Sequence, residues 1–462
     1  MRMAGAPAGR FGRKTGPDVR MKTIVLAFSG GLDTSFCAAW LREQTGADIV
    51  SVCVDTGGFS PEGLAAVAAR ARSLGVREHR TVDARADVWT RFVSYLIKGN
   101  VLRGGVYPVS VGCERTAQAE AVVEVARELG ADAVAHGSTG AGNDQVRFDV
   151  AIGARAPGLA ILTPIRDLNW SRAQEAEWLT SRGFSVPASA VSYSLNEGLF
   201  GTTIGGKETH DPWKLPPDAA YTMTVPATQA AAEPEELVLG FERGVPVSLD
   251  GRALDGVALV AELNRRARPH GVGRGVHVGD TILGLKGRIA FEAPAPLILI
   301  RAHRELAKLV HTKWQAYWAE QAGTFYGMLL HEGLFYDPAM RDLEALLDSA
   351  NERVGGEVRV RLYRGSHDVV GTRSPHSLLN PEIAVYGEGA SAWTGAQAAG
   401  FARIHGLPSM LAARRDQVAP LAGDAPAHGS SAGTAPASAQ DSIESKSPAG
   451  ARAGVRKEGA GA

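Results

Sequence analysis

The sequence predicts an α/β protein in which a doubly wound parallel sheet is followed by an α+β region. Short apolar runs alternate with amphipathic helical patterns through about the first 190 residues, which is typical of parallel strands joined by helices. Glycine-rich segments follow two of these apolar runs, and beyond residue 190 glycine- and proline-rich turns separate strands from helices less regularly. Since loops at the carboxyl ends of parallel strands meet at one edge, we expect both glycine-rich segments to open onto one crevice.

The elements expected in the first region begin with a strand at residues 24–28 and a helix at 34–43. They continue with a strand at 48–54 and a helix at 61–74 that has proline in its first turn. An amphipathic helix at 114–129 and an apolar strand at 131–136 come next.

In the second region we expect strands at 236–242 and 245–249 and helices at 258–265 and 296–309. A strand at 357–363 alternates polar and apolar residues, so one of its faces is expected to be exposed. A helix near 396–405 followed by Gly406, Leu407 and Pro408 is expected to end the ordered part, and the Ala/Gly/Pro/Ser-rich chain at 416–462 is expected to be disordered.

Composition narrows the possible partners and compartment. The chain has 462 residues, and its 49 basic and 49 acidic residues balance, so net charge gives no case for nucleic acid or an anionic membrane as partner. Three scattered cysteines, Cys37, Cys53 and Cys113, suit a reducing cytoplasm better than a disulfide framework or a zinc site. No apolar run approaches the roughly 20 residues of a membrane span, and residues 1–20 lack an apolar signal core. We therefore expect a cytoplasmic protein with small-molecule substrates.

The segment AFSGGLDTS at residues 27–35 follows the first apolar run and opens the first helix. Gly30 and Gly31 let the backbone approach an anion closely, and the N–H groups and dipole of the new helix favour negative charge there. Asp33 is a candidate ligand for Mg²⁺. The segment lacks the lysine of the GxxxxGK[ST] loop. It resembles instead the loop of ATP pyrophosphatases, which holds the β,γ-pyrophosphate of ATP while the α-phosphorus is attacked.

Three hydroxyl side chains in the same segment, Ser29, Thr34 and Ser35, add hydrogen-bond donors for phosphate. The alternative interpretation is a glycine-rich turn between strand and helix that binds nothing. The complete nonapeptide behind an apolar strand favours the nucleotide loop.

The second glycine-rich segment, HGSTGAGNDQVRF at residues 136–148, mixes donors and acceptors within a few positions. Thr139 and Asn143 can donate to carboxylates, whereas Asp144 can accept from an ammonium, and this combination suits a zwitterion. The alternative is an Asx-rich turn between strand and helix.

Together the two segments resemble argininosuccinate synthases, and other segments agree with that family in order and spacing. They are residues 193–200 (YSLNEGLF), 211–213 (DPW), 270–274 (HGVGR), 284–288 (GLKGR), 291–294 (FEAP), 302–303 (AH) and 400–407 (GFARIHGL).

The resemblance covers about residues 22–410 and implies an ATP pyrophosphatase (adenine nucleotide alpha hydrolase-like) sheet. It implies a nucleotide-binding domain at 21–190 and a synthetase and multimerisation domain at 191–415, after an N-terminal extension at 1–20 that we expect to be disordered, with Met21 a candidate start of the folded part.

The reaction implied by the resemblance joins citrulline to aspartate at the expense of ATP, with Mg²⁺, and releases AMP and diphosphate. The ureido oxygen attacks the α-phosphorus, and the amine of aspartate then displaces AMP. A homotetramer with a C-terminal helix that reaches across subunits is implied as well.

Site residues implied by the resemblance fall into three groups. ATP is expected at Ala27, Phe28, Ser29, Gly30, Gly31, Leu32, Asp33, Thr34, Ser35, Val54 and Gly137; aspartate at Thr139, Asn143 and Asp144; and citrulline at Tyr107, Asn143, Arg147, Ser194 and Thr203.

Several positions depart from the family pattern, and most of them are expected on the acceptor side. A family Glu is replaced by Gly279 and another by Gly205; a Tyr is replaced by Phe291; a Thr-Ser or Thr-Ala pair is replaced by Val111 and Gly112; and a Lys is replaced by Ala141.

These departures leave two interpretations of the acceptor open. In one, Glu114 supplies the missing carboxylate and citrulline remains the acceptor; in the other, the acceptor is a ureido or amide compound without the amino-acid head group. A third possibility for Glu114 itself is a solvated residue in the first turn of its helix, where the dipole favours a negative charge.

Other function classes fit less well. An RNA-modifying enzyme with the same ATP loop needs a basic surface, and the net charge here is zero. A silent nucleotide-binding paralogue has no need of both Asp33 and the Asn143-Asp144 pair. A glutamine-dependent amidotransferase needs an N-terminal catalytic cysteine, which the sequence lacks.

Overall fold

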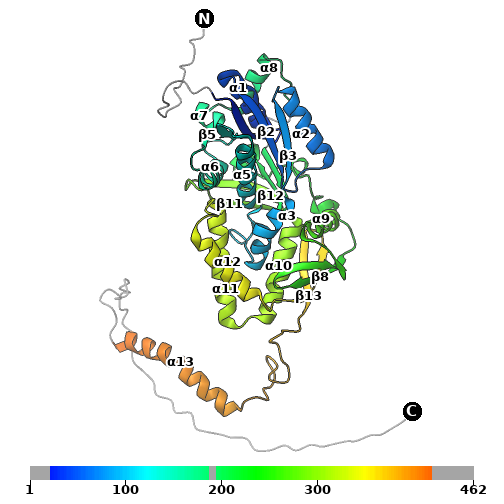
Figure 1. Ribbon diagram of the computed structural model, residues 1–462. Helices are drawn as coiled ribbons and strands as arrows, with labels where there is room; N and C mark the ends of the chain where they lie inside the picture. The colour runs from blue at the N-terminus through cyan, green and yellow to red at the C-terminus, as the bar shows by residue number, and fades with distance from the viewer. Residues whose placement is uncertain (1–20, 187–193, 419–462) are drawn as a thin grey trace, which may run out of the picture. The chain divides into compact units, whose positions relative to one another are not determined.

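The computed structural model describes residues 21–186 and 194–418 (Figure 1). The terminal regions expected to be disordered, 1–20 and all but the first residues of 416–462, lie outside this range, as does Tyr193 of the YSLNEGLF segment. By its internal contacts the chain forms one unit up to Asn380 and a second from Pro381 onward.

A five-stranded parallel sheet forms the first layer of the fold, in the order β3-β2-β1-β4-β5. Along β1, Ile24 and Leu26 pack on one face and Val25 on the other, as the period of two in a strand requires. One face is covered by α1, α2 and α8 and the other by α5 and α6 (Figure 1), which confirms the predicted doubly wound α/β class. The strands are β1 (Thr23–Ala27), β2 (Asp48–Asp55), β3 (Glu78–Asp83), β4 (Ala133–Ala135) and β5 (Ala160–Leu162).

The helices between these strands begin where the local sequence favours them. Ser60 caps α2, with proline at its first position, and Ser171 caps α8 in a capping box with Gln174. Helix α5 begins four residues earlier than predicted, so that Val111 and Gly112 lie in its first turn. Helix α6 begins inside the second glycine-rich segment, which places Arg147 on a helix. The helices are α1 (Leu32–Thr45), α2 (Pro61–Ser73), α5 (Ser110–Leu129), α6 (Asp144–Arg155), α7 (Pro164–Leu168) and α8 (Arg172–Ser181).

Two antiparallel sheets follow, one of four strands in the order β11-β12-β7-β6 and one of five in the order β10-β9-β8-β13-β14. The alternation predicted for β13 is confirmed, since Val358, Val360 and Leu362 are buried and the residues between them are exposed. The strands are β6 (Ser194–Gly198), β7 (Gly201–Gly205), β8 (Glu235–Glu242), β9 (Val245–Leu249), β10 (Arg252–Ala253), β11 (Arg274–Asp280), β12 (Lys286–Glu292), β13 (Gly356–Tyr363) and β14 (Ser366–Arg373).

The core beside the five-stranded antiparallel sheet combines segments far apart in sequence. Phe92 and Leu96, which come from the first region, pack there with residues of α9 to α12. The domain boundary near residue 190 stays a prediction, and this packing joins the segments on its two sides. The helical elements are α3 (Arg85–Val88), the π-helical turn Trp89–Val93, α4 (Ser94–Lys98), α9 (Gly256–Ala267), α10 (Pro294–Val310), α11 (Lys313–His331) and α12 (Pro338–Asn351).

The last helix corrects the expectation that order ends at residues 406–408. Helix α13 (Gly395–Val418) continues through Pro408. A proline inside a helix removes one N–H donor, but good helix formers such as Leu411, Ala412 and Ala413 follow and continue the helix.

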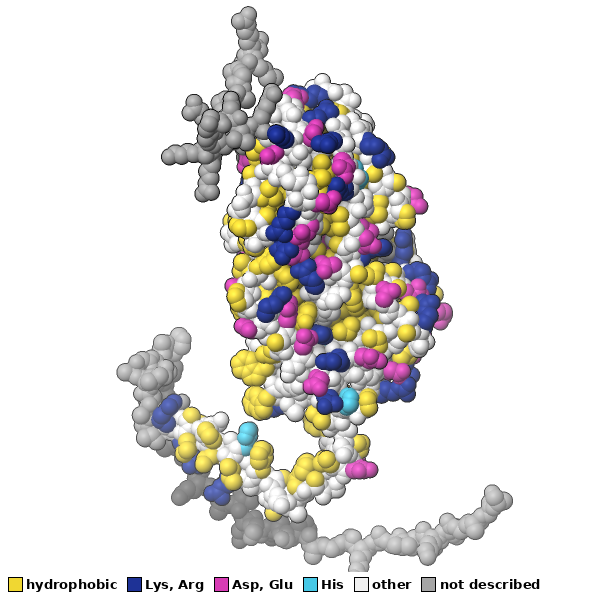
Figure 2. Space-filling model, in the orientation of Figure 1, with side chains coloured by type: hydrophobic (Ala, Val, Ile, Leu, Met, Phe, Trp, Pro, Cys, Tyr) yellow, Lys and Arg dark blue, Asp and Glu magenta, His cyan; other side chains and the backbone are white. Residues whose placement is uncertain are grey.

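The surface is mixed in charge. Figure 2 shows acidic and basic side chains interspersed over the visible face of the first unit, in keeping with the balanced composition. Exposed aromatic side chains gather on α11, where Trp314, Tyr317 and Trp318 are each at least half exposed. Within the described residues no helix is both long and apolar enough to cross a membrane.

Candidate functional site

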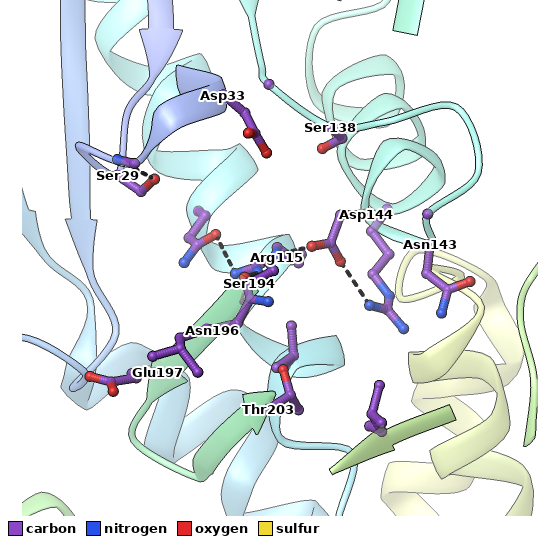
Figure 3. Close-up of a pocket in the computed structure, with 18 of the residues that line it drawn as sticks. Ser29, Asp33, Arg115, Ser138, Asn143, Asp144, Ser194, Asn196, Glu197 and Thr203 are labelled. Carbon is purple, nitrogen blue, oxygen red and sulfur yellow. Dashed lines mark hydrogen bonds and ion pairs between the residues drawn. The ribbon is translucent and has the colours of Figure 1, made fainter. Parts of the chain in front are cut away.

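A cavity of about 990 Å³ lies at the carboxyl ends of the parallel strands, where the four-stranded antiparallel sheet faces them. The loops after β1, β2 and β4 line one part of it, and strands β6, β7, β11 and β12 line another (Figure 3). The expected meeting of the two glycine-rich segments is confirmed, because residues of both line this cavity.

The turn between β1 and α1 is shaped for an anion by its backbone. Gly30 has a φ of +77°, which favours glycine. Gly31 is the N-cap of α1 and has no side chain with which to cap the helix, so the first N–H groups of α1 are left for a ligand. Beside them, the hydroxyl oxygens of Ser29 and Thr34 lie 3.3 Å apart.

Most of the predicted ATP residues line the cavity, but Gly30 and Ser35 do not. Ser35 is fully buried; its hydroxyl donates to the carbonyl of Gly30 and accepts from Nε of Arg70, so it faces away from the cavity. The residues that do line it are Ala27, Phe28, Ser29, Gly31, Leu32, Asp33, Thr34, Val54 and Gly137.

Gly137 lies against the start of α1. A Cβ on this residue would be 3.2 Å from Cγ2 of Thr34 and 3.4 Å from the carbonyl carbon of Asp33. The loop after β4 therefore approaches the nucleotide loop more closely than a side chain would comfortably allow.

Asp33 combines a buried oxygen with nearby charged groups. Its Oδ1 accepts no hydrogen bond, and Nε of Arg172 lies 3.8 Å away. Burial, followed by the charge of Asp33, raises the pKa of Glu175 to about 8. The carboxyl group of Glu175 therefore stays largely protonated at neutral pH. Within the described residues, no group of three or more His, Cys, Asp or Glu side chains could hold a metal ion by itself.

The three predicted aspartate residues, Thr139, Asn143 and Asp144, all line the cavity. Asp144 lies between two guanidinium groups, with Oδ2 at 2.9 Å from Nε of Arg115 and Oδ1 at 2.9 Å from an amino group of Arg147 (Figure 3). Burial alone would raise the pKa of Asp144, but the two arginines outweigh it and the pKa is lowered. Asp144 is therefore a fixed negative charge at neutral pH.

The predicted acceptor residues Tyr107, Arg147, Ser194 and Thr203 line the cavity with Asn143. Tyr107 is buried, and its ring stacks on His277 at a centroid distance of 5.7 Å. Its hydroxyl accepts a long hydrogen bond of 3.3 Å from Ser110.

Of the positions that depart from the family pattern, only Val111 and Gly279 line the cavity. Phe291 is buried behind Tyr107, with its ring centroid 5.4 Å away. Gly112 and Gly205 lie outside the cavity lining, and a Cβ on Gly205 would meet nothing closer than 4.0 Å.

Neither role proposed for Glu114 agrees with the structure. Its side chain is 1 % exposed, so it is not solvated, and it is absent from the cavity lining, so it does not replace the missing carboxylate. Helix α5 begins four residues before Glu114, which turns this side chain inward against Gly198. Burial raises its pKa to about 8, and the charge of Arg115 and weak polar contacts with Thr56 and the backbone of Phe200 offset only part of that. Glu114 is thus a largely neutral, buried acid at pH 7.

The cavity is also lined by polar side chains to which the sequence alone assigned no role, among them Arg103, Arg115, Asn196, His277, Arg288 and His331. Asn196 and Arg288 lie within family segments of the sequence, and Arg115 donates to Asn196 at 2.6 Å. His331 ends α11 and reaches the site only through the tertiary fold.

Two family models together match most of this chain. The model for the arginosuccinate synthase N-terminal HUP domain matches residues 23–185, and that for the C-terminal domain matches residues 193–412. The chain is 40% identical over 390 residues to the argininosuccinate synthase of Methanocaldococcus jannaschii, which covers 84% of this chain and 98% of the relative.

Two bacterial relatives show a similar identity to this chain. Identity is 41% over 397 residues with the argininosuccinate synthase of Xanthomonas campestris pv. campestris, which covers 85% of this chain and 98% of the relative. It is 40% over 389 residues with that of Rubrobacter xylanophilus, at 84% and 94% coverage. On this likeness, and with both glycine-rich segments on one cavity, the chain belongs to the argininosuccinate synthase family.

Proposed function

We propose that this protein is an AMP-forming carbon–nitrogen ligase of the argininosuccinate synthase type. ATP activates the ureido oxygen of an acceptor, for which citrulline is the family's substrate, and the amine of aspartate then replaces AMP. The observation that carries the proposal is the single cavity lined by Asp33, by Asn143 and Asp144 and by Tyr107 and Arg147, because one reaction must bring three ligands together.

Chemically, the ureido oxygen forms a bond to the α-phosphorus as the bond to the bridging oxygen of diphosphate breaks. The aspartate nitrogen then bonds to the ureido carbon, the carbon–oxygen bond to AMP breaks, and the amine releases a proton. No covalent bond to the protein is needed, so the protein contributes orientation and charge stabilisation. In our proposal the loop from Ser29 to Thr34 holds the phosphates, and Thr139, Asn143 and Asp144 hold aspartate.

Mg²⁺ is part of the proposal, with the phosphates as its main ligands. Oδ1 of Asp33 is buried and accepts no hydrogen bond, and Asp33 lines the cavity, so its carboxylate suits one position on a hard cation. Bound there, Mg²⁺ would neutralise phosphate charge. Nε of Arg172 lies 3.8 Å from the same oxygen.

A homotetramer and a cytoplasmic location complete the proposal. The exposed aromatic side chains of α11 and the exposed helix α13 support assembly of several chains, since exposed apolar patches of this kind mark protein contacts. The three buried free thiols suit a reducing compartment. Light scattering of the purified chain tests the tetramer.

The decisive experiment measures diphosphate and AMP release by the purified full chain with ATP, Mg²⁺, aspartate and a ureido acceptor. Release that requires both aspartate and the acceptor supports the ligase. Nucleotide binding without release for any ureido or amide acceptor points to a silent paralogue, and release that requires RNA points to a modifying enzyme.

A further inference from the structure

One end of the cavity is rich in positive charge. It is formed by residues 103–111, the start of α6, strands β11 and β12 and the end of α11. We call it the cationic end and define it by the side chains of Arg103, Tyr107, Arg147, His277 and His331. All five side chains line the cavity. Gly279 and Gly287 complete this wall with backbone only.

Arg103 and Arg147 converge on one imidazole. An amino nitrogen of Arg103 lies in hydrogen-bonding contact with Nε2 of His331, and an amino nitrogen of Arg147 lies 3.1 Å from Nδ1 of the same ring. A neutral imidazole accepts at one nitrogen only, so its own N–H must face one of the two guanidinium groups. Burial and the two arginines lower the pKa of His331 to about 3, so the ring adds no charge. One of the two guanidinium groups therefore faces an N–H of the ring and not an acceptor.

Two carboxylates act on the charge of Arg103: Glu332, which does not line the cavity, and Asp280, which does. No carboxylate of the described residues lies within 4.0 Å of Arg103, whose other partner is the backbone carbonyl of Asp280. The carboxylate of Asp280 instead pairs with Lys286 at 2.5 Å. Asp144 is shared by Arg147 and Arg115, so the pair of arginines exceeds it by one charge.

Glu197 also lines the cavity, but at another part of its wall. A Cβ on Gly58 would lie 2.9 Å from Cβ of Glu197, which places Glu197 beside the turn after β2. In Figure 3 it lies on the opposite side of the labelled group from Asn143, whose amide oxygen accepts from the N–H of Ile282. The cationic end thus offers donors and aromatic surface, and the carboxylates that line the cavity near it, Asp144 and Asp280, are already paired with cations.

His277 adds a second observation. Its side chain is buried, its Nε2 has no hydrogen-bond partner, and it lies against Tyr107 and Gly279. A Cβ at position 279 would be 2.5 Å from this Nε2, so the ring occupies the space that a longer side chain at 279 would need. An unpartnered buried nitrogen in a ligand cavity favours a polar ligand group there.

We propose that the acceptor presents a carboxylate, and no ammonium, to the cationic end, so that the preferred substrates are ureido acids without an amino group. This rests on the proposed ligase function. The bonds made and broken are those given above, and the product is an amidino-linked aspartate that carries one positive charge fewer than argininosuccinate. The simplest probe is 5-ureidopentanoate, which is citrulline without its α-amino group.

The test compares four acceptors of one chain length by diphosphate release: citrulline, 5-ureidopentanoate, 4-ureidobutylamine (ammonium without carboxylate) and butylurea (neither group). We expect kcat/KM for 5-ureidopentanoate to exceed that for citrulline by about tenfold or more, since an unpaired buried ammonium beside arginines is costly. Citrulline at or above 5-ureidopentanoate would overturn this inference and leave the ligase standing.

Direct binding separates the two proposals if turnover is absent. Calorimetric titration of the same four compounds, in the presence of an ATP analogue that cannot be cleaved between its α- and β-phosphates, ranks them without chemistry. Tighter binding of 5-ureidopentanoate than of citrulline, with no diphosphate from either, would support the inference and overturn the ligase. Equal or weaker binding would overturn the inference.

Variants test the residues that carry the argument. Arg103→Gln should raise KM for 5-ureidopentanoate about tenfold or more and leave that for butylurea nearly unchanged. The matched control is Arg77→Gln on the surface, where the arginine pairs with Asp48. A double variant combines Gly279→Glu with His277→Ala, because the alanine removes the ring that the new side chain would meet. It should shift the ratio of kcat/KM values from 5-ureidopentanoate toward citrulline. An unchanged ratio in both variants would contradict the inference.

Discussion

The two ends of the cavity are built in different ways. The nucleotide end is made from backbone: a glycine of positive φ, a helix N-terminus without a side-chain cap, and Gly137 of the second glycine-rich segment packed against that helix start. The cationic end is made from side chains of four separate segments, among them Arg103, Arg147, His277 and His331. A backbone site for phosphate leaves little room for change, whereas a side-chain site can change its ligand with a few substitutions.

Replacing Asp33 with Ala tests the nucleotide end most severely. We expect turnover to fall by roughly 10³-fold, because a carboxylate at the phosphates acts on charge that develops in the transition state. Circular dichroism should show an unchanged fold. The control is Asp342→Ala on the exposed side of α12. Near-normal activity of Asp33→Ala would mean that this carboxylate does not contact the metal or the phosphates.

Asp144→Asn tests the two ion pairs that Asp144 makes. It leaves Arg115 and Arg147 without the carboxylate that pairs both of them. An unpaired buried charge costs about 2–5 kcal/mol, so we expect kcat/KM for aspartate to fall by about 10²-fold or more. Steady-state kinetics in aspartate, ATP and acceptor measure this. A loss confined to the acceptor would place Asp144 with the cationic end instead.

Gly137→Ala should affect the nucleotide end alone. The new methyl group would lie 3.2 Å from Thr34 and 3.4 Å from the backbone of Asp33, so the start of α1 must shift by tenths of an ångström. We expect KM for ATP to rise about tenfold with the ranking of acceptors unchanged. Gly153→Ala in α6, where a Cβ meets nothing within 4 Å, is the matched control. A changed acceptor ranking would show that the two ends are coupled.

The smallest effect on turnover is expected at Glu114, which lies outside both ends, and its effect is on stability instead. Its pKa is about 8 when folded, against an ordinary value of 4.5, so the folded protein holds a proton that the unfolded chain has released. Stability therefore falls as pH rises from 4.5 to 8, by up to about 1.4 kcal/mol per pH unit for one proton.

Glu114→Gln should remove this dependence. Denaturant melts at pH 5 and pH 8 should show that the variant gains stability relative to the natural chain at the higher pH, with acceptor ranking unchanged. Parallel curves for the two proteins would mean that Glu114 is not buried as a neutral acid.

Local sequence predicted the elements that carry the nucleotide end, because strand, glycine turn and helix are consecutive there. Element limits moved by a few residues, and one of these shifts mattered: the earlier start of α5 turned Glu114 inward, which the residue pattern around position 114 did not reveal. The sequence likewise predicts a helix end near Pro408, whereas the helix formers after it continue α13 to Val418.

By itself the sequence determined the α/β class, the phosphate-binding turn and the family, because each depends on residue types at short spacing. Only the tertiary structure decided which charges face the acceptor. Arg103, His277 and His331 come from segments more than 50 residues apart, and a charge balance among such groups exists only once the chain is folded. The ion-pair distances show that, among the residues that the structure describes, Arg147 is paired with a carboxylate whereas Arg103 is not. No pattern along the sequence indicates that difference.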